Sequence, residues 1–431
     1  MPAPRISVMN TPDFIAALLT LAALFSYINH RWLRLPTTIG LMILALMTSL
    51  LLIALGYVVP SVALWGRGVL EQIDFEQALM NGMLAFLLFA GALHINLGDL
   101  AKQGPVIALL ASIGVLISTA IIAVFVWFIG KYVVGVDLAF IYCLLFGALI
   151  SPTDPIAVLG ILKTVGAPKA LKTNIAGESL FNDGVGVVVF LVLAGLAGFG
   201  HGGHIDMTVG GIIRLFTVET GGGLLTGLIL GFIAYRMLKS VDNYQVEILI
   251  SLALVAGGYA FCNHLHLSGP IAMVVAGLLI GNHGRTLAMS DSTREHLDTF
   301  WELVDELLNA VLFVLIGLEM LVLTFTGKFL LAGLVAIPAT LLARFIVVGG
   351  LVQVFRRHRK MTPHTAKIIT WSGLRGGISV ALALSIPKAI HGEHIAERDA
   401  IIAITYVVVV FSIIVQGLTV APLLRACGHG K

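Results

Sequence analysis

The chain has 431 residues, of which 58% are hydrophobic and 11% are charged, and its formal net charge at pH 7 is +3. This composition is typical of a polytopic membrane protein. It excludes a large soluble domain, because apolar runs long enough to cross a hydrocarbon core of about 30 Å recur with only short polar breaks. The basic residues are scattered among loops, so the sequence also argues against nucleic-acid binding.

Apolar segments between charged breaks predict thirteen membrane-spanning helices in an all-α protein. We expect them near residues 13–29, 37–58, 77–97, 105–129, 138–162, 173–199, 209–236, 245–262, 268–283, 301–325, 329–354, 365–386 and 399–424. Basic residues outside these spans lie mostly in alternate loops, and loops rich in such residues are usually cytoplasmic. The N-terminus is therefore expected outside the cell and the C-terminus in the cytoplasm.

The spans form a single predicted domain, residues 1–431, that can be divided into two inverted six-helix repeats. The repeats would cover about 13–199 and 245–424, with a linking helix near 209–236. Only a short tail follows Leu424, so we expect no soluble regulatory domain.

Each predicted repeat has an interruption in its fifth span. Pro152 and Pro155 break the first, and the run Gly-Leu-Arg-Gly-Gly at 373–377 breaks the second. Helix breakers at corresponding places indicate crossed discontinuous helices and a transport site near the middle of the membrane. Proline and glycine are common in membrane helices for other reasons, but the charges inside both breaks favour the functional interpretation.

Three carboxylates lie inside these apolar stretches, and each costs about 2.5 kcal/mol or more at the bilayer centre unless it has a partner or a cavity. In the first break, Asp154 can cap a new half-helix that begins with Pro155. Free carbonyls and the Thr153 hydroxyl would lie beside it. We therefore expect Asp154 to serve an ion site as well, because hard cations such as Na⁺ prefer oxygen ligands.

The next span carries four polar residues that alternate between two helical faces. Ser179 and Asp183 are four residues apart and share one face, while Glu178 and Asn182 share the adjacent face. Apolar surroundings and neighbouring carboxylates bring the titration of a carboxyl group toward cellular pH. Asp183 is therefore predicted to hold either a proton or a metal cation, so that loading one ion requires release of the other.

Glu178 is the carboxylate most suited to a simple ion pair with an arginine. Arg375 is its expected partner, since a lone guanidinium in the broken twelfth span would be as costly as a lone carboxylate. Arg344, in the preceding span, is the competing choice.

Three segments together resemble one known family. Residues 151–183, the stretch from Phe300-Trp301-Glu302 to Gly317-Leu318-Glu319, and residues 373–377 closely resemble NhaP-type cation/proton antiporters, the bacterial relatives of animal Na⁺/H⁺ exchangers. The resemblance extends over nearly the whole chain. It implies a 13-helix fold like that of NhaA and NapA, in which a core domain moves against a dimerisation domain. It also implies a homodimer in the lipid bilayer of a bacterial inner membrane, which exchanges Na⁺ or Li⁺ for H⁺ without a cofactor and is not an enzyme.

The resemblance assigns roles to the polar residues of the breaks and the sixth span. By this resemblance Asp183 carries the ion and the proton, and Asn182 supports its carboxylate. The residues that help to coordinate Na⁺ are Thr153, Asp154 and Ser179. Glu178 pairs with Arg375. The Asn-Asp order at residues 182 and 183 is similar to the electroneutral branch of the family. Some relatives carry a glutamate after Leu-Leu-Phe in the third span, where this chain has Ala90, so that span offers no third carboxylate.

Alternatives remain open at this point. A K⁺/H⁺ exchanger on the same scaffold would use the same oxygen ligands. A passive cation channel belongs to another class, but the sequence has no repeated filter segment and no arginine ladder. An intramembrane hydrolase would need Asp154 and Asp183 to share a proton, yet neither has a Gly-x-Gly-Asp context.

Three further acids are expected to frame a cytoplasmic funnel that attracts cations: Glu302, Asp305 and Glu306.

Overall fold

The computed structural model describes residues 11–59, 68, 75–135, 138–199, 209–284, 290–323, 326–356, 364–390 and 393–428. Within these ranges the regular secondary structure is helical apart from a small antiparallel pair of strands, β1 (Ala389–Ile390) and β2 (Glu393–His394). Seven described helices are long and apolar enough to cross a membrane. Helical segments lie over all thirteen predicted ranges. The all-α class is therefore confirmed, whereas the count of thirteen spans stays a prediction. The two termini, whose sides of the membrane the sequence predicted, lie outside the described residues.

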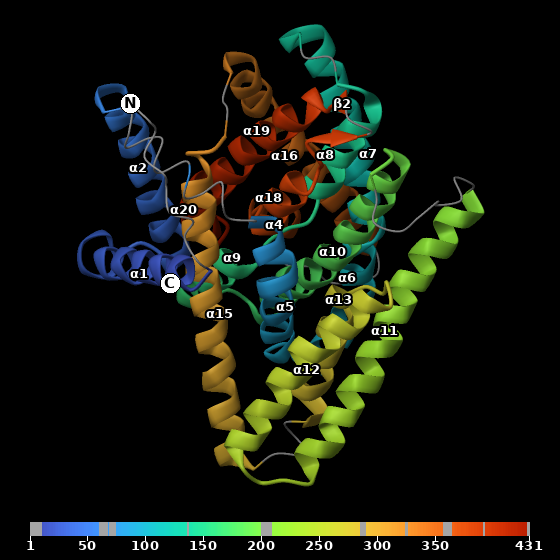
Figure 1. Ribbon diagram of the computed structural model, residues 1–431. Helices are drawn as coiled ribbons and strands as arrows, with labels where there is room; N and C mark the ends of the chain where they lie inside the picture. The colour runs from blue at the N-terminus through green and yellow to red at the C-terminus, as the bar shows by residue number, and fades with distance from the viewer. Residues whose placement is uncertain are drawn as a thin grey trace.

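One group of helices packs together as a unit, which we call the scaffold bundle (Figure 1). The long helix α15 contacts α1, α2, α5 and α12, and α13 contacts α5, α11 and α12. The members are α1 (Thr11–Ile28), α2 (Thr37–Val58), α5 (Leu84–Leu93), α11 (Val209–Lys239), α12 (Tyr244–His264), α13 (Gly269–Leu279) and α15 (Asp291–Glu319), with the short segments η1 (Asn29–Leu33), α4 (Phe75–Gln77), η2 (Ala78–Met83) and η4 (Ile280–Gly284).

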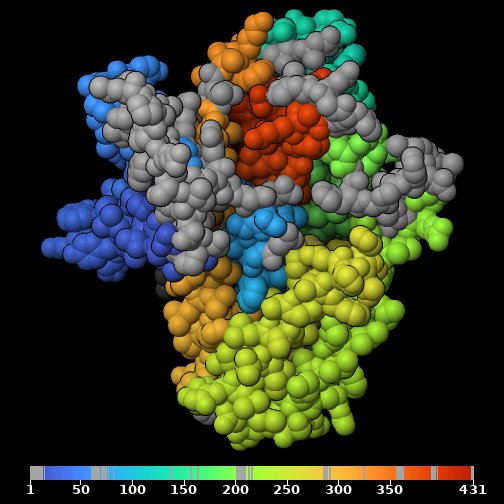
Figure 2. All heavy atoms as spheres, viewed as in Figure 1, coloured from blue at the N-terminus to red at the C-terminus, as the bar shows by residue number. Residues whose placement is uncertain are grey.

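The remaining helices form a second unit, the site bundle. Here α7 contacts α8 and α16, α10 contacts α6 and α8, and α19 contacts α16 and α18. The members are α6 (Leu97–Ala111), α7 (Ile113–Ile129), α8 (Phe140–Ile150), α9 (Ile156–Val165), α10 (Lys169–Leu196), α16 (Gly327–Arg356), α17 (Thr365–Trp371), α18 (Gly377–Leu384), α19 (Ala396–Phe411) and α20 (Gly417–Ala426), with η3 (Gly130–Val134) and η5 (Ser412–Gln416). In Figure 2 the yellow-green to yellow helices of the scaffold bundle occupy the lower part of the face shown, and red C-terminal helices of the site bundle the upper part.

Two broken helices cross inside the site bundle, at the places where the sequence predicted interruptions. One break separates α8 from α9, and the other separates α17 from α18. The backbone N–H of Asp154 donates to the carbonyl of Leu374 at 2.8 Å, which makes an isolated antiparallel bridge between the two irregular segments. This bond satisfies one donor and one acceptor that the broken helices leave free, as buried backbone in a membrane requires.

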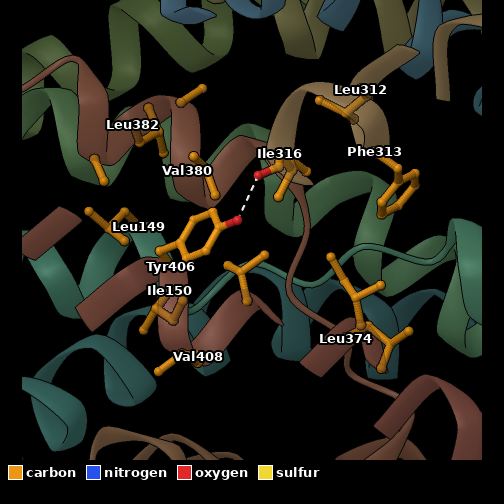
Figure 3. Packing of buried hydrophobic residues seen from close by; sticks show 14 of the residues in the cluster. Leu149, Ile150, Leu312, Phe313, Ile316, Leu374, Val380, Leu382, Tyr406 and Val408 are labelled. Carbon is orange, nitrogen blue, oxygen red and sulfur yellow. Dashed lines mark hydrogen bonds between the residues drawn. The ribbon is translucent and has the colours of Figure 1, made fainter. Parts of the chain in front are cut away.

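Hydrogen bonds hold the C-terminal part of α15 between the two bundles. The Tyr406 hydroxyl of α19 donates to the Ile316 carbonyl at 2.9 Å, among buried side chains that include Val380 and Leu149 (Figure 3). On the scaffold side, the Ser49 hydroxyl of α2 donates to the Gly317 carbonyl at 2.9 Å. With its C-terminal end fixed in this way, α15 presents its preceding turns to the space between the bundles.

A buried asparagine shapes the corner between α1 and α2. The side chain of Asn29 donates to the Leu35 carbonyl at 2.9 Å and accepts from the Leu35 N–H at 3.3 Å. Gly40 makes room for this amide, because a Cβ there would collide with it. The corner leaves Arg34 in the left-handed region with a φ of 54°, a conformation that few non-glycine residues adopt without such support.

We predict that Asn29→Ala destabilises the protein by about 1–3 kcal/mol, because the polar backbone groups of Leu35 lose their buried partner. Thermal unfolding of the detergent-solubilised protein, followed by tryptophan fluorescence, measures the effect. Thr20→Ala is the matched control, since its hydroxyl is exposed and bonds only within α1. Equal melting temperatures for the two variants would contradict a structural role for this corner.

Candidate ion-binding site

Three buried polar side chains connect α10 to the first break. The Thr153 N–H donates to Asn182 Oδ1 at 3.2 Å, and Asn182 Nδ2 donates to Thr153 Oγ1 at 3.0 Å. Thr153 Oγ1 and Ser179 Oγ also lie 3.0 Å apart. All three side chains are buried, so both ends of the Asn182 amide are committed to holding this cluster together.

The carboxylate of Asp154 lies against the start of α18. It occupies the space that a Cβ would need at Gly376, the residue that precedes this helix. The N-terminus of a helix carries partial positive charge and stabilises a nearby carboxylate. The sequence predicted Asp154 as a cap for the half-helix that follows it, and the structure finds its carboxylate at the half-helix of the opposite break.

Asp183 faces the same region from α10. It is 7% exposed, lines one cavity together with Asp154, and interacts electrostatically with Asp154 and Arg375. Gly186 allows the close approach of α10 to the break, since a Cβ there would collide with the ring of Pro152. The two carboxylates on this cavity are oxygen ligands of the kind that an alkali cation prefers. The predicted ligands Thr153 and Ser179 are buried behind them and are not among the residues that line the cavity.

Arg375 binds the backbone of the first break. Its Nη1 donates to the carbonyls of Ser151 at 2.6 Å and Pro152 at 2.7 Å, and its own N–H donates to Ser412 Oγ at 2.9 Å. These carbonyls follow the end of α8 and would otherwise lack donors at this depth. The guanidinium thus fixes the break beside the two carboxylates.

The predicted ion pair between Glu178 and Arg375 is wrong. Glu178 Oε1 accepts from Nη1 of Arg344 at 2.8 Å, and Arg344 also donates to the Ile369 carbonyl from Nε and Nη2. Gly373 leaves space for this side chain, because a Cβ there would collide with the guanidinium. The physical reason is that the buried carbonyls of Ser151 and Pro152 already accept hydrogen bonds from Arg375, while α16 brings Arg344 to Glu178.

A cavity of about 930 Å³ connects the carboxylates with the protein surface. Asp154 and Asp183 line it, and so does Gly376. Ala90, at the position where some relatives carry a glutamate, lines it as well. Basic side chains from both bundles also line it: Arg34, Lys169, Lys172 and Arg425. Asp183 is thus neither sealed nor turned toward lipid, which a residue that exchanges ions with water requires.

Among the polar residues of this cavity to which the sequence assigned no role, Asn309 is deeply buried. It is 2% exposed, lines the cavity, and donates from Nδ2 to Asp305 Oδ1 at 3.1 Å. The signal that could have found it is its spacing from the predicted funnel acids, since it lies seven residues after Glu302 and four after Asp305 on the same helical face.

Comparison with known proteins gives consistent matches over almost the whole chain. Residues 19–426 match the family model described as sodium/hydrogen exchanger, transmembrane. The chain is 49% identical over 426 residues to the Na⁺/H⁺ antiporter NhaP of Pseudomonas aeruginosa, covering 97% of each protein. It is 34% identical to the Na⁺/H⁺ antiporter NhaH of Halobacillus dabanensis, covering 96% of this chain and 98% of that one. Its fold is similar to the sodium proton antiporter MjNhaP1 of Methanocaldococcus jannaschii, with a TM-score of 0.73 and 22% identity over 97% of this chain and 100% of that chain.

We predict that a double-mutant cycle will identify the partner of Glu178. Arg344→Met alone should destabilise the protein by about 3–5 kcal/mol, because it leaves a buried carboxylate unpaired. The double variant Glu178→Gln/Arg344→Met should lose much less unfolding free energy than the sum of the losses of the two single variants. Unfolding of the purified protein in detergent, followed by tryptophan fluorescence, provides the four free energies.

The matched cycle pairs Glu178→Gln with Arg375→Met, another buried arginine of the same bundle. Its coupling energy should be smaller than that of the first cycle, because Arg375 donates to backbone carbonyls. A larger coupling for Arg375 than for Arg344 would contradict the observed pairing.

Proposed function

Because the chain belongs to the sodium/hydrogen exchanger family, we propose that it exchanges Na⁺ for H⁺ across a membrane by competition of the two ions for Asp183. The observation that carries the proposal is the position of Asp183 and Asp154 on one cavity. The Thr153 hydroxyl belongs to the residue before Asp154, and the Ser179 hydroxyl lies one turn before Asp183 on α10. A cation bound among these oxygens lowers the proton affinity of the carboxylates, and a bound proton removes the charge that holds the cation. Occupation by one ion thus excludes the other.

An electroneutral exchange of one Na⁺ for one H⁺ fits the titratable groups at the site. Asn182 cannot take up a proton, and its amide is engaged by Thr153 at both ends. Arg375 keeps a fixed positive charge against the carbonyls of the break. With Asp154 held at the start of α18, Asp183 remains as the group that loads and releases one charge per cycle. Li⁺ is expected to replace Na⁺, and no cofactor is needed for this competition.

The finer architecture is part of the same proposal. Thirteen spans in two inverted repeats would allow the site bundle to move against the scaffold bundle and expose Asp183 to each side in turn. The basic side chains along the cavity lie at or next to helix ends that the positive-inside rule assigns to the cytoplasm. We therefore infer a cavity that opens to the cytoplasm, in a homodimer of the bacterial inner membrane with its C-terminus inside.

Replacement of the proposed carrier is the direct test. Asp183→Asn keeps the shape of the side chain but can hold neither a proton nor a compensating charge, so it should abolish exchange completely. The measurement is recovery of acridine-orange fluorescence when Na⁺ is added to respiring everted vesicles from a host without its own Na⁺/H⁺ antiporters. Exchange by Asp183→Asn at the wild-type rate would refute the assignment.

The matched control is Asp13→Asn, which removes an exposed carboxylate from α1 and should leave exchange unchanged. Li⁺ should support exchange in the wild-type protein, and K⁺ alone should not. An imposed membrane potential should leave the rate of Na⁺/H⁺ exchange unaltered. Exchange in K⁺ alone would favour the K⁺/H⁺ alternative, and a rate that follows the potential would exclude a one-for-one stoichiometry.

Another prediction concerns the position of the Asp154 carboxylate beside Gly376. In Gly376→Ala the new Cβ would collide with the Asp154 carboxylate and displace it from the start of α18. Because displacement of a reacting group by about 1 Å can cost about a hundredfold, we expect exchange to fall by about ten- to a hundredfold. Gly160→Ala is the matched control, since Gly160 lines the same cavity and an added Cβ would meet no atom within 4 Å. Equal rates for the two variants, measured in the same vesicles, would argue against this role of Gly376.

A further inference from the structure

One face of α15 carries a polar stripe along the cavity. Glu302, Asp305, Glu306 and Asn309 have the spacing of one helical face, and all four line the cavity. Exposure falls along the stripe, from the exposed side chains of Glu302 and Glu306 to Asn309, which is 2% exposed. The next cavity-lining residue on this face is apolar, Leu312. The stripe therefore runs from the exposed part of α15 to a buried polar end.

The buried end of the stripe contains an oxygen atom that lacks a donor. Asn309 Nδ2 donates to Asp305 Oδ1 at 3.1 Å, which directs Asn309 Oδ1 elsewhere. Asn309 Oδ1 is buried and has no hydrogen-bond partner in the described part of the chain. A buried acceptor without a donor destabilises the folded protein. A bound cation would offset that cost, because carboxylate and amide oxygens are ligands that hard cations prefer.

This pair lies on the same cavity as Asp154 and Asp183. Asp305 interacts electrostatically with Asp154 as well as with Glu302 and Glu306. One turn beyond Asn309, the side chain of Leu312 fills the space that a Cβ would need at Gly377. Gly377 follows directly on the residue against which Asp154 packs. A cation at Asp305 and Asn309 would therefore lie within electrostatic reach of the site that we assign to Asp183.

We propose that Asp305 and Asn309 form an auxiliary cation site, which holds Na⁺ before the ion passes to Asp154 and Asp183. The proposal rests on the Na⁺/H⁺ exchange proposed above. The auxiliary site differs from a general attraction by the acidic residues. It depends on one half-buried carboxylate and its buried asparagine rather than on the charge of the cavity as a whole.

The auxiliary site serves only one side of the membrane. Asp305 and Asn309 belong to α15 of the scaffold bundle, whereas Asp154 and Asp183 belong to the site bundle. When the site bundle moves to expose Asp183 to the opposite side, Asp305 stays with the scaffold and can no longer deliver the ion. Loss of the auxiliary site should therefore weaken Na⁺ loading from the cavity side alone.

The test compares Na⁺ concentration dependence in everted and right-side-out vesicles. With the cavity open to the cytoplasm, Asp305→Asn should raise the half-saturating Na⁺ concentration about tenfold in everted vesicles, as loss of a supporting ligand group commonly does. The maximal rate in everted vesicles and the half-saturating concentration in right-side-out vesicles should stay at wild-type values. A merely structural change would alter both orientations.

Glu302→Gln is the matched control, because it removes the same charge from the same helical face and cavity at an exposed position. It should shift the half-saturating concentration by less than about twofold, since exposed charges are screened by salt. Equal shifts for Asp305→Asn and Glu302→Gln would overturn the proposal in favour of general attraction. Equal effects of Asp305→Asn in both vesicle orientations would overturn it as well.

A binding measurement separates this proposal from the proposed function. Purified Asp183→Asn should still bind ²²Na⁺ weakly in a scintillation proximity assay, and either Asp305→Asn or Asn309→Leu added to it should remove that binding. Persistent binding in both double variants would overturn the auxiliary site while leaving the role of Asp183 intact. Normal transport by Asp183→Asn would overturn the proposed function, whatever the outcome at Asp305.

Discussion

The structure depends on how the backbone of two broken helices is satisfied where they cross. Asp154 and Leu374 share one backbone hydrogen bond, and Arg375 donates to the carbonyls that follow α8. Each break thus supplies what the other lacks, a carboxylate for the start of α18 and a guanidinium for the end of α8. Without these contacts, irregular backbone could not persist in an apolar environment. The crossing therefore also fixes the positions of the proposed ion ligands.

The arrangement of the bundles explains why breaks from distant parts of the chain meet. The scaffold bundle contains the first three spans of each predicted repeat together with the linking helix, and the site bundle contains the last three of each. The fifth spans of both predicted repeats therefore lie in the same bundle and can cross. Motion between the bundles would leave the crossing undisturbed, because its hydrogen bonds lie within the site bundle.

Much of this organisation could be predicted from the sequence. Proline at 152 and 155 and glycine around Arg375 mark the two breaks, and the four-residue spacing of Ser179 and Asp183 places a hydroxyl and a carboxylate on one face. The partner of Glu178 could not be predicted in the same way. That choice depends on which arginine the free carbonyls engage and on how closely α16 approaches α10, and sequence spacing contains neither quantity. Asp305 was predicted only as one of three funnel acids, and Asn309 received no role. The reason is that the acids were considered as a group of charges rather than by the helical face that they share with Asn309.

At two glycines in the second break, side chains from elsewhere in the chain occupy the space that a side chain of that position would need. The Arg344 guanidinium fills the side-chain volume missing at Gly373, and the Asp154 carboxylate fills the one missing at Gly376. Neither glycine can therefore be replaced by a larger residue unless its partner, Arg344 or Asp154, changes at the same time. Selection for a different transported ion, in nature or in the laboratory, would have to find its first steps elsewhere, among the cavity-lining residues that have room for a new side chain.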